Sequence, residues 1–195
     1  MTSPRQRRSR IFKIGRRTAP AAPALVVVLA FTLGVTSAAQ AQTFTVLHTF
    51  TGAQDGAYPD GGLTMDGAGN FYGTTFGGPP SSDPYGSVYK LTYRGSSWVV
   101  SPLYSFQGGS DGQYPRAKPV LGPDGTLYGV TLYGGDEGCD QGDGCGTVYN
   151  LRPAASACRS ALCSWTETVL HRFTGGADGG SPLYVTLIFD AAGNL

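Results

Sequence analysis

Leu47-His-Thr-Phe-Thr-Gly-Ala-Gln-Asp-Gly-Ala-Tyr-Pro59 is the stretch that decides the fold, because it returns twice: as Leu103-Tyr-Ser-Phe-Gln-Gly-Gly-Ser-Asp-Gly-Gln-Tyr-Pro115 and as Leu170-His-Arg-Phe-Thr-Gly-Gly-Ala-Asp-Gly-Gly-Ser-Pro182. Each copy keeps Leu, Phe, Asp-Gly and Pro at the same spacing. Self-similarity over this length indicates tandem structural units of one kind. Single strands are therefore assigned within the repeat.

Each copy continues with an apolar run and a turn: Leu63-Thr-Met-Asp-Gly-Ala-Gly-Asn-Phe71, Val120-Leu-Gly-Pro-Asp-Gly-Thr-Leu127 and Leu187-Ile-Phe-Asp-Ala-Ala-Gly-Asn-Leu195. The first two copies then add Tyr72-Gly-Thr-Thr75 or Tyr128-Gly-Val-Thr131, a Gly-Gly loop, and Gly86-Ser-Val-Tyr-Lys-Leu91 or Gly146-Thr-Val-Tyr-Asn-Leu151. The phenylalanines Phe50, Phe106 and Phe173 are 56 and 67 residues apart. The difference falls in connections, which indicates surface loops on a fixed scaffold.

Within one period we expect four short strands, near 98–106, 119–121, 126–131 and 147–151. Asp-Gly, Pro-Asp-Gly and Gly-Gly between them supply the positive φ angles of tight turns. Four strands per unit of about 50 residues favour an all-β, β-propeller-like tandem repeat of four-stranded blades. The array is incomplete, with about two and a half repeats at 44–97, 98–164 and a truncated 165–195. A β-sandwich or a β-solenoid is the alternative architecture.

Residues 1–41 have the pattern of a secretory signal peptide, which leaves 42–195 as the repeat region. Seven basic residues precede position 18, residues 24–35 are apolar, and Ala39-Gln40-Ala41 forms a small-residue cleavage site. An uncleaved membrane anchor is the alternative, but spanning a bilayer takes about 18 or more apolar residues. Arg7-Arg8 and Arg16-Arg17 lack a convincing twin-arginine context. We therefore expect a secreted, periplasmic or cell-surface protein without a membrane span in its mature chain.

Composition and charge narrow the classes of partner. The chain has 30 glycines among 195 residues, about twice the ordinary share, which suits a turn-rich β protein. Its formal net charge is +1, but removing the basic head leaves seven basic against 13 acidic residues, a net charge of −6. An acidic surface repels phosphates, so nucleic acid is not an expected partner.

All four cysteines, Cys139, Cys145, Cys158 and Cys163, lie in the part expected to be exported. An even number in an oxidising compartment predicts disulfides. Three pairings exist, and the local pairs Cys139–Cys145 and Cys158–Cys163 are favoured because each closes a short loop. Zinc is the alternative, although spacings of five and four intervening residues without nearby histidines fit it poorly.

The sequence contains no nucleophile elbow, zincin helix, Walker loop or dinucleotide fingerprint. His48 and His171 occupy equivalent repeat positions, where the second copy has Tyr104, and this favours a structural role for both. Asp55, Asp111 and Asp178 recur once per copy before glycine. They are interpreted as aspartates that cap their own turns. The alternative is a recurring calcium site built from carboxylates and carbonyls, and no other cofactor is expected.

Two further features carry possible chemistry. The acidic loop 136–145 holds four acids and two cysteines, and its spacing does not match an EF-hand, so a disulfide-pinned surface loop is expected, with metal or ligand contact as the alternative. Recurring tyrosines would stack on sugars if they faced solvent, although packing between blades explains their fixed positions as well. These pairs are Tyr58 with Tyr114, Tyr72 with Tyr128 and Tyr89 with Tyr149.

Taken together, the motifs L-[HY]-x-F-x-G-x-x-D-G, D-x-x-G-N-[FL]-Y-G-T-T (complete only in the first copy) and G-[ST]-V-Y-x-L resemble the repeat of bacterial choice-of-anchor tandem GloVer-repeat proteins over residues 44–195. The resemblance implies export, a propeller-like array and often a C-terminal surface anchor, with no established activity. No anchor motif occurs here, and the third copy stops at Leu195, so the chain resembles a fragment of a longer product.

We therefore expect a non-catalytic, exported binding or interaction module whose ligand is a carbohydrate or a protein. Self-association through an open blade edge is a further expectation. The competing hypothesis is an extracellular carbohydrate-active enzyme, a glycoside hydrolase or lyase, that uses Asp or Glu carboxylates.

Overall fold

The computed structural model describes residues 43–77, 84–136, 138–153 and 165–195. The expected signal peptide at 1–41 and the second cysteine pair, Cys158 with Cys163, lie outside the described residues. All strands belong to the unit Thr45–Leu195.

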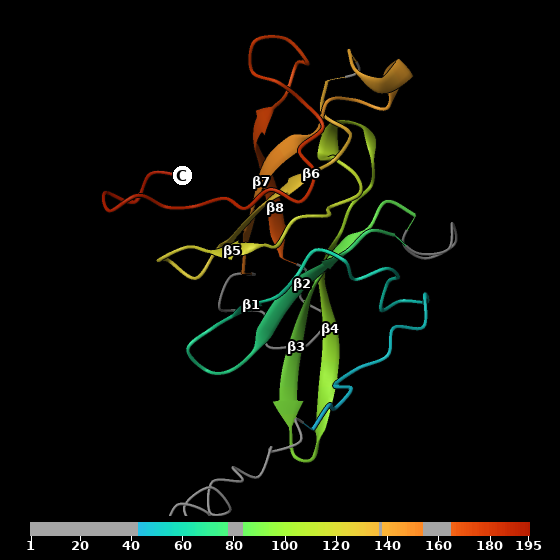
Figure 1. Ribbon diagram of the computed structural model, residues 1–195, viewed down its shortest axis with the longest axis vertical. Coiled ribbons are helices and arrows are strands. Elements are labelled where there is room, and N and C mark those ends of the chain that lie inside the picture. Colours follow the sequence, from blue (N-terminus) through green and yellow to red (C-terminus); the bar gives the residue numbers. More distant parts are fainter. Residues whose placement is uncertain (1–42, 78–83, 137, 154–164) are drawn as a thin grey trace, which may run out of the picture. The chain divides into compact units, whose positions relative to one another are not determined.

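Eight strands form two four-stranded antiparallel sheets, ordered β1-β2-β3-β4 and β5-β6-β7-β8 (Figure 1). The first sheet contains β1 (Thr64–Met65), β2 (Phe71–Thr75), β3 (Ser87–Arg94) and β4 (Ser97–Ser105). The second contains β5 (Val120–Leu121), β6 (Leu127–Thr131), β7 (Thr147–Arg152) and β8 (Thr166–Arg172). Two short 3-10 turns, η1 (Gly109–Asp111) and η2 (Asp140–Gly142), follow β4 and β6, and the described residues contain no α-helix.

The all-β prediction and the four strands per period are therefore confirmed, and the strands fall within one or two residues of the expected runs. Each sheet takes its first three strands from one sequence repeat and its fourth from the start of the next. β4 and β8 contain the leucine of the Leu-x-x-Phe motif, and the phenylalanine directly follows each strand. This offset joins consecutive sheets covalently through the strand that closes each one. The equivalent stretch 45–50 pairs with no strand among the described residues.

The Tyr-Gly and Val-Tyr motifs of the repeat meet across the sheet. Gly73 pairs with Tyr89 and Gly129 pairs with Tyr149, each directly opposite. A Cβ at Gly73 would lie 2.5 Å from the Tyr89 hydroxyl oxygen, and one at Gly129 would lie 2.3 Å from that of Tyr149. Glycine is required because the tyrosine ring lies over it. A β-bulge before each tyrosine, at Val88/Tyr89 and Val148/Tyr149, recurs in both sheets.

The Ser or Thr of the Gly-[Ser/Thr]-Val-Tyr motif has an equally local cause. Thr75 and Ser87 share a hydroxyl–hydroxyl hydrogen bond of 2.7 Å, and Thr131 and Thr147 share one of 2.8 Å. The backbone N–H of Ser87 and that of Thr147 also donate to the facing threonine hydroxyl. All four side chains are buried. A buried hydroxyl without a hydrogen-bond partner would destabilise the fold, and these bonds give each hydroxyl a partner.

One hydrophobic core spans both sheets; its buried members are Tyr72, Val88, Leu103, Phe106, Leu127, Tyr149 and Leu151. Phe106 packs edge-on against Tyr149, with ring centroids 5.1 Å apart, and Phe50 packs on Tyr89 in the same way at 4.9 Å. Backbone contacts add to this packing: Trp165 N–H donates to the Leu103 carbonyl oxygen at 3.0 Å. The same ring contact thus recurs within each of the first two repeats.

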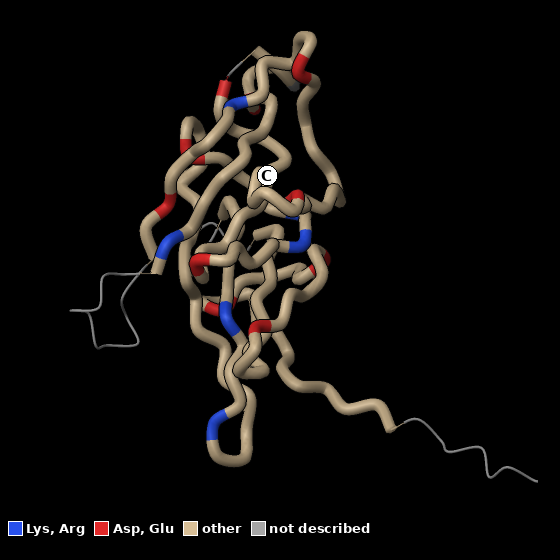
Figure 2. Tube along the Cα trace, turned by 90° about the vertical axis from the view of Figure 1, so that its left-hand side faces the viewer, with Lys and Arg blue, Asp and Glu red and all other residues tan. Residues whose placement is uncertain are grey.

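Acidic and basic residues are interspersed along the Cα trace (Figure 2). In the described part of the chain, no helix is both long and apolar enough to cross a bilayer.

Candidate functional site

Each of the three recurring aspartates lies in a turn of its own repeat and receives hydrogen bonds there. Asp55 accepts from His48 Nε2 at 3.1 Å and from the N–H and hydroxyl of Thr51 at 3.0 and 2.6 Å. Asp178 accepts from His171 and Thr174 in the same pattern. Asp111 accepts from the Tyr104 hydroxyl and from the Gln107 N–H, both at 2.7 Å. The structure does not bring the three aspartates together.

These donors shape the electrostatics of the turns. Burial would raise the pKa of Asp55, but the hydrogen bonds from Thr51 and His48 outweigh it and lower the pKa to about 2. Hydrogen bonding by the Thr174 side chain lowers the pKa of Asp178. Both carboxylates accept hydrogen bonds from residues of their own turn, as expected of aspartates that cap turns. Among the described residues, no group of three or more acidic, His or Cys side chains is arranged to hold a metal. The calcium hypothesis stays a prediction.

The acidic loop is closed by a disulfide between Cys139 and Cys145, as expected, with Cα atoms 4.9 Å apart. The loop is also held by Cys145 N–H, which donates to the Asp136 carbonyl. The third repeat packs on it closely, since a Cβ at Gly175 would lie 2.3 Å from the Cys139 sulfur. The disulfide therefore closes the β6–β7 loop on itself and packs against the turn that follows β8.

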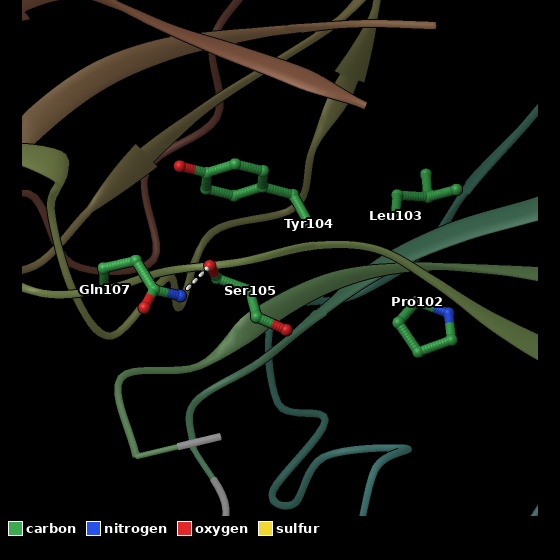
Figure 3. Close-up of a pocket in the computed structure, with 5 residues that line it drawn as sticks. All are labelled: Pro102, Leu103, Tyr104, Ser105 and Gln107. Carbon is green, nitrogen blue, oxygen red and sulfur yellow. Dashed lines mark hydrogen bonds between the residues drawn. The ribbon is translucent and has the colours of Figure 1, made fainter. Parts of the chain in front are cut away.

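A pocket of about 320 Å³ lies at the end of β4, lined by Pro102, Leu103, Tyr104, Ser105 and Gln107 (Figure 3). Two of its polar side chains are already paired within the chain. Gln107 donates its side-chain amide to the Ser105 carbonyl at 2.9 Å, and Tyr104 donates its hydroxyl to Asp111. A ligand that used the Tyr104 hydroxyl or the Gln107 amide would first have to break these bonds, which disfavours the pocket as a recognition site.

Glu167 on β8 is a carboxylate near this pocket that the sequence did not single out. Its Oε1 is shielded from solvent and has no hydrogen-bond partner among the described residues. Burial, then the nearby charge of Asp111, raises the pKa of Glu167 to about 7, with Arg172 opposing the rise. Val100 stands at the equivalent register position of the first sheet, opposite Leu91 as Glu167 is opposite Leu151. A carboxyl thus replaces an aliphatic side chain.

A row of aromatic side chains, which we term the aromatic row, crosses from the first repeat to the second. It consists of Tyr58, Phe76, Tyr114 and Tyr133, with successive ring centroids 6.5, 4.6 and 6.1 Å apart. Phe76 directly follows β2 and Tyr133 follows β6 by two residues. The two tyrosines before Pro59 and Pro115 therefore meet the aromatic residue at the end of the second strand of each sheet.

Arg116 places a positive charge against the aromatic row. Its guanidinium lies 3.9 Å from the centre of the Phe76 ring, and Tyr114 stacks on Phe76 at 4.6 Å. Arg116 Nε lies 3.7 Å from Asp60 Oδ2, an ion pair too long for a hydrogen bond, and this shielded Nε has no partner of its own. The Tyr184 hydroxyl accepts from Arg116 and donates to Asp60, both at 3.4 Å.

Solvent reaches this cluster at two tyrosines. Tyr58 is 71% exposed and Tyr184 is 57% exposed, whereas Tyr72, Tyr89 and Tyr149 are buried in the core. The recurring tyrosines therefore divide between packing and exposure. We define the Tyr58 site as Tyr58, Asp60, Phe76, Arg116 and Tyr184.

Two interactions at these sites were missed from the sequence. The His–Asp and Tyr–Asp pairs follow a constant offset of seven residues within each repeat, a spacing that could have identified them. Asp60 and Arg116 both directly follow the proline of their copy, so opposite charges occupy one repeat position. Tyr184 lies outside any shared motif, and no sequence signal marked it.

Comparison with known families confirms the resemblance drawn from the motifs. The model of the Gloeobacter/Verrucomicrobia repeat matches residues 31–195. Neither a curated protein nor a solved structure matches the chain.

Proposed function

Because the chain belongs to the Gloeobacter/Verrucomicrobia repeat family, we propose that it is an exported, non-catalytic β-propeller repeat protein that acts as a binding module outside the cell. The ligand is a carbohydrate or a protein. The observation that carries this proposal is the Tyr58 site, which combines an ion pair with two exposed tyrosines. Exposed rings beside a paired carboxylate and guanidinium offer a ligand both an apolar surface and hydrogen-bonding groups.

A propeller-like array is supported by equivalent segments of the three repeats. β1, β5 and residues 186–189 of the third repeat line one groove of about 540 Å³. In a propeller the first strand of every blade borders the central axis. Thr64 on β1 also donates its hydroxyl to the Pro119 carbonyl beside β5, which brings two of these strands into direct contact.

Export is supported by the leader-like pattern of residues 1–41 and by the disulfide of the acidic loop, since disulfides persist in oxidising compartments. We propose cleavage after Ala41. Intact-mass measurement of protein recovered outside the cytoplasm tests this directly, because cleavage there leaves Gln42 as the first residue. A mature protein that retains its basic head would contradict it.

One observation favours the alternative of a carbohydrate-active enzyme. Glu167 has the raised pKa of a general acid, and Asp111 is close enough to influence it. However, Asp111 is held by Tyr104 and Gln107, and a glycosidase needs both carboxylates free to face one substrate.

A single assay separates the two functions. The purified chain is run by native affinity electrophoresis in a panel of soluble polysaccharides, and the same mixtures are assayed for new reducing ends. Retardation without new ends supports the binding module. Release of reducing ends that Glu167→Gln abolishes would replace the proposal with the enzyme.

A further inference from the structure

The Tyr58 site combines features that together specify one class of ligand. Its two exposed rings, Tyr58 and Tyr184, flank an ion pair between Asp60 and Arg116. We propose that this site binds a neutral carbohydrate, with a sugar ring stacked on Tyr58 and its hydroxyls bonded to Asp60 and Arg116. The inference rests on the proposed function and names its ligand and residues.

The backbone at Tyr58 shows that its side chain is not there for the turn alone. Tyr58, Tyr114 and Ser181 occupy one repeat position and have φ of 55°, 59° and 48°. This left-handed region disfavours bulky side chains. Ser181 shows that a small residue suffices for the turn. Tyr114 has a packing reason for its ring, since Phe76, Tyr85 and Tyr133 surround it. Tyr58 contacts Phe76 alone in that row and otherwise faces solvent.

Arg116 is fixed in advance of any ligand. Phe76 supports its guanidinium face at 3.9 Å, while Asp60 and the Tyr184 hydroxyl border its edge. A guanidinium and a carboxylate held side by side offer donors and acceptors for adjacent hydroxyls without losing further side-chain entropy. The Arg116 and Asp60 side chains are 27% and 34% exposed, so polar atoms of the pair other than the shielded Nε of Arg116 remain open to a ligand.

The charge of the site sets the class of sugar. Asp60 and Arg116 cancel, so the site has no net positive charge to hold a uronate or a sulfated sugar, and the region 42–195 has a net charge of −6. A neutral sugar has an apolar C–H face for an aromatic ring and a rim of hydroxyls for the ion pair. That division matches two rings with polar groups between them. Binding to a neutral ligand should also depend little on salt.

The test measures affinity by isothermal titration with a soluble β-glucan, a xylan, a mannan and polygalacturonate. Tyr58→Ala and Arg116→Gln should each weaken binding to the preferred neutral polymer at least tenfold. Tyr93→Ala, which removes a comparably exposed tyrosine from the β3–β4 hairpin, should change it less than twofold. Raising NaCl from 0.05 to 0.5 M should also change the affinity less than twofold. Circular dichroism checks that each variant is folded. Tyr58→Ala should fold normally, because it removes a ring that is mostly in solvent.

Each outcome decides the inference. Loss of binding in the two site variants with retention in Tyr93→Ala supports it. Equal binding by all variants overturns this site and leaves the binding module standing. Preference for polygalacturonate overturns the neutral class. No binding to any polymer overturns the carbohydrate ligand, and capture of a protein partner at the same site would then identify the ligand class. Turnover of a polymer is the result that overturns the proposed function itself.

Discussion

At the scale of single residues, the carboxyl of Glu167 makes the stability of the fold depend on pH between the acidic and the neutral range. Its pKa is raised from 4.5 to about 7, first by burial and then by Asp111. The unfolded chain releases this proton near pH 4.5 and the folded chain near pH 7. Between these values the unfolded state binds fewer protons, so stability falls as pH rises and stays reduced above pH 7.

We therefore expect Glu167→Gln to remove this pH dependence and to stabilise the protein at pH 8 by about 1 kcal/mol, a value reduced for the partial exposure of the side chain. Urea unfolding at pH 5, 6, 7 and 8 measures it. Asp143→Asn, at an exposed acid of the disulfide loop, is the control and should track the wild type. A parallel pH profile for Glu167→Gln would show that the carboxyl is not disfavoured in the fold.

Gly129 tests the steric origin of the Tyr-Gly motif. A Cβ there would lie 2.3 Å from the hydroxyl oxygen of Tyr149, which is fully buried and cannot move aside without disturbing the core. We expect Gly129→Ala to destabilise the fold by about 1–3 kcal/mol, measured as a shift in the urea midpoint. Gly67→Ala is the matched control, because nothing lies within 4 Å of its Cβ position. Equal midpoints for the two variants would contradict this explanation.

At the scale of elements, the disulfide of the β6–β7 loop is the clearest structural constraint. Cys139 and Cys145 are six residues apart, and closing so short a loop stabilises by about 2 kcal/mol through the entropy of the unfolded chain. The double variant Cys139→Ser, Cys145→Ser should lose about that much stability in urea. Since the bridge also packs against Gly175, amide exchange should rise around residues 174–180. An unchanged midpoint would mean that the native packing alone holds the loop.

The strands were predictable because turn chemistry marks their ends. Asp-Gly and Gly-Gly bound the runs at 126–131 and 147–151, and the observed strands are Leu127–Thr131 and Thr147–Arg152. The Tyr58 site was only partly predictable. Tyr58 was a candidate through its repeat position, but the partnership of Asp60 with Arg116 joins residues one period apart, and Tyr184 comes from a third repeat. Local patterns cannot specify such contacts, because they depend on how neighbouring repeats pack.

At the scale of the whole molecule, the contact between the two sheets shows which apolar side chains of the repeat are covered and which stay exposed. Leu103 on β4 is 7% exposed, because the second sheet covers it, whereas its equivalent Leu170 on β8 is 51% exposed. Phe106 likewise packs on Tyr149 of β7. Its equivalent Phe173 contacts the His171 ring and has no ring contact with a tyrosine among the described residues. The β8 surface thus exposes the equivalents of the side chains that hold the first sheet to the second.

We expect this surface to drive self-association, since apolar side chains that are buried at one repeat position gain from burial at the equivalent one. Sedimentation velocity from low micromolar to several hundred micromolar protein should show a concentration-dependent rise in mean mass. Leu170→Lys should suppress that rise, because a charged head cannot be buried without a partner. Tyr93→Lys, at an exposed residue of the first sheet, should leave it unchanged. A wild type that stays monomeric across the range, or equal suppression by both variants, would show that the exposed β8 surface does not act as an interface.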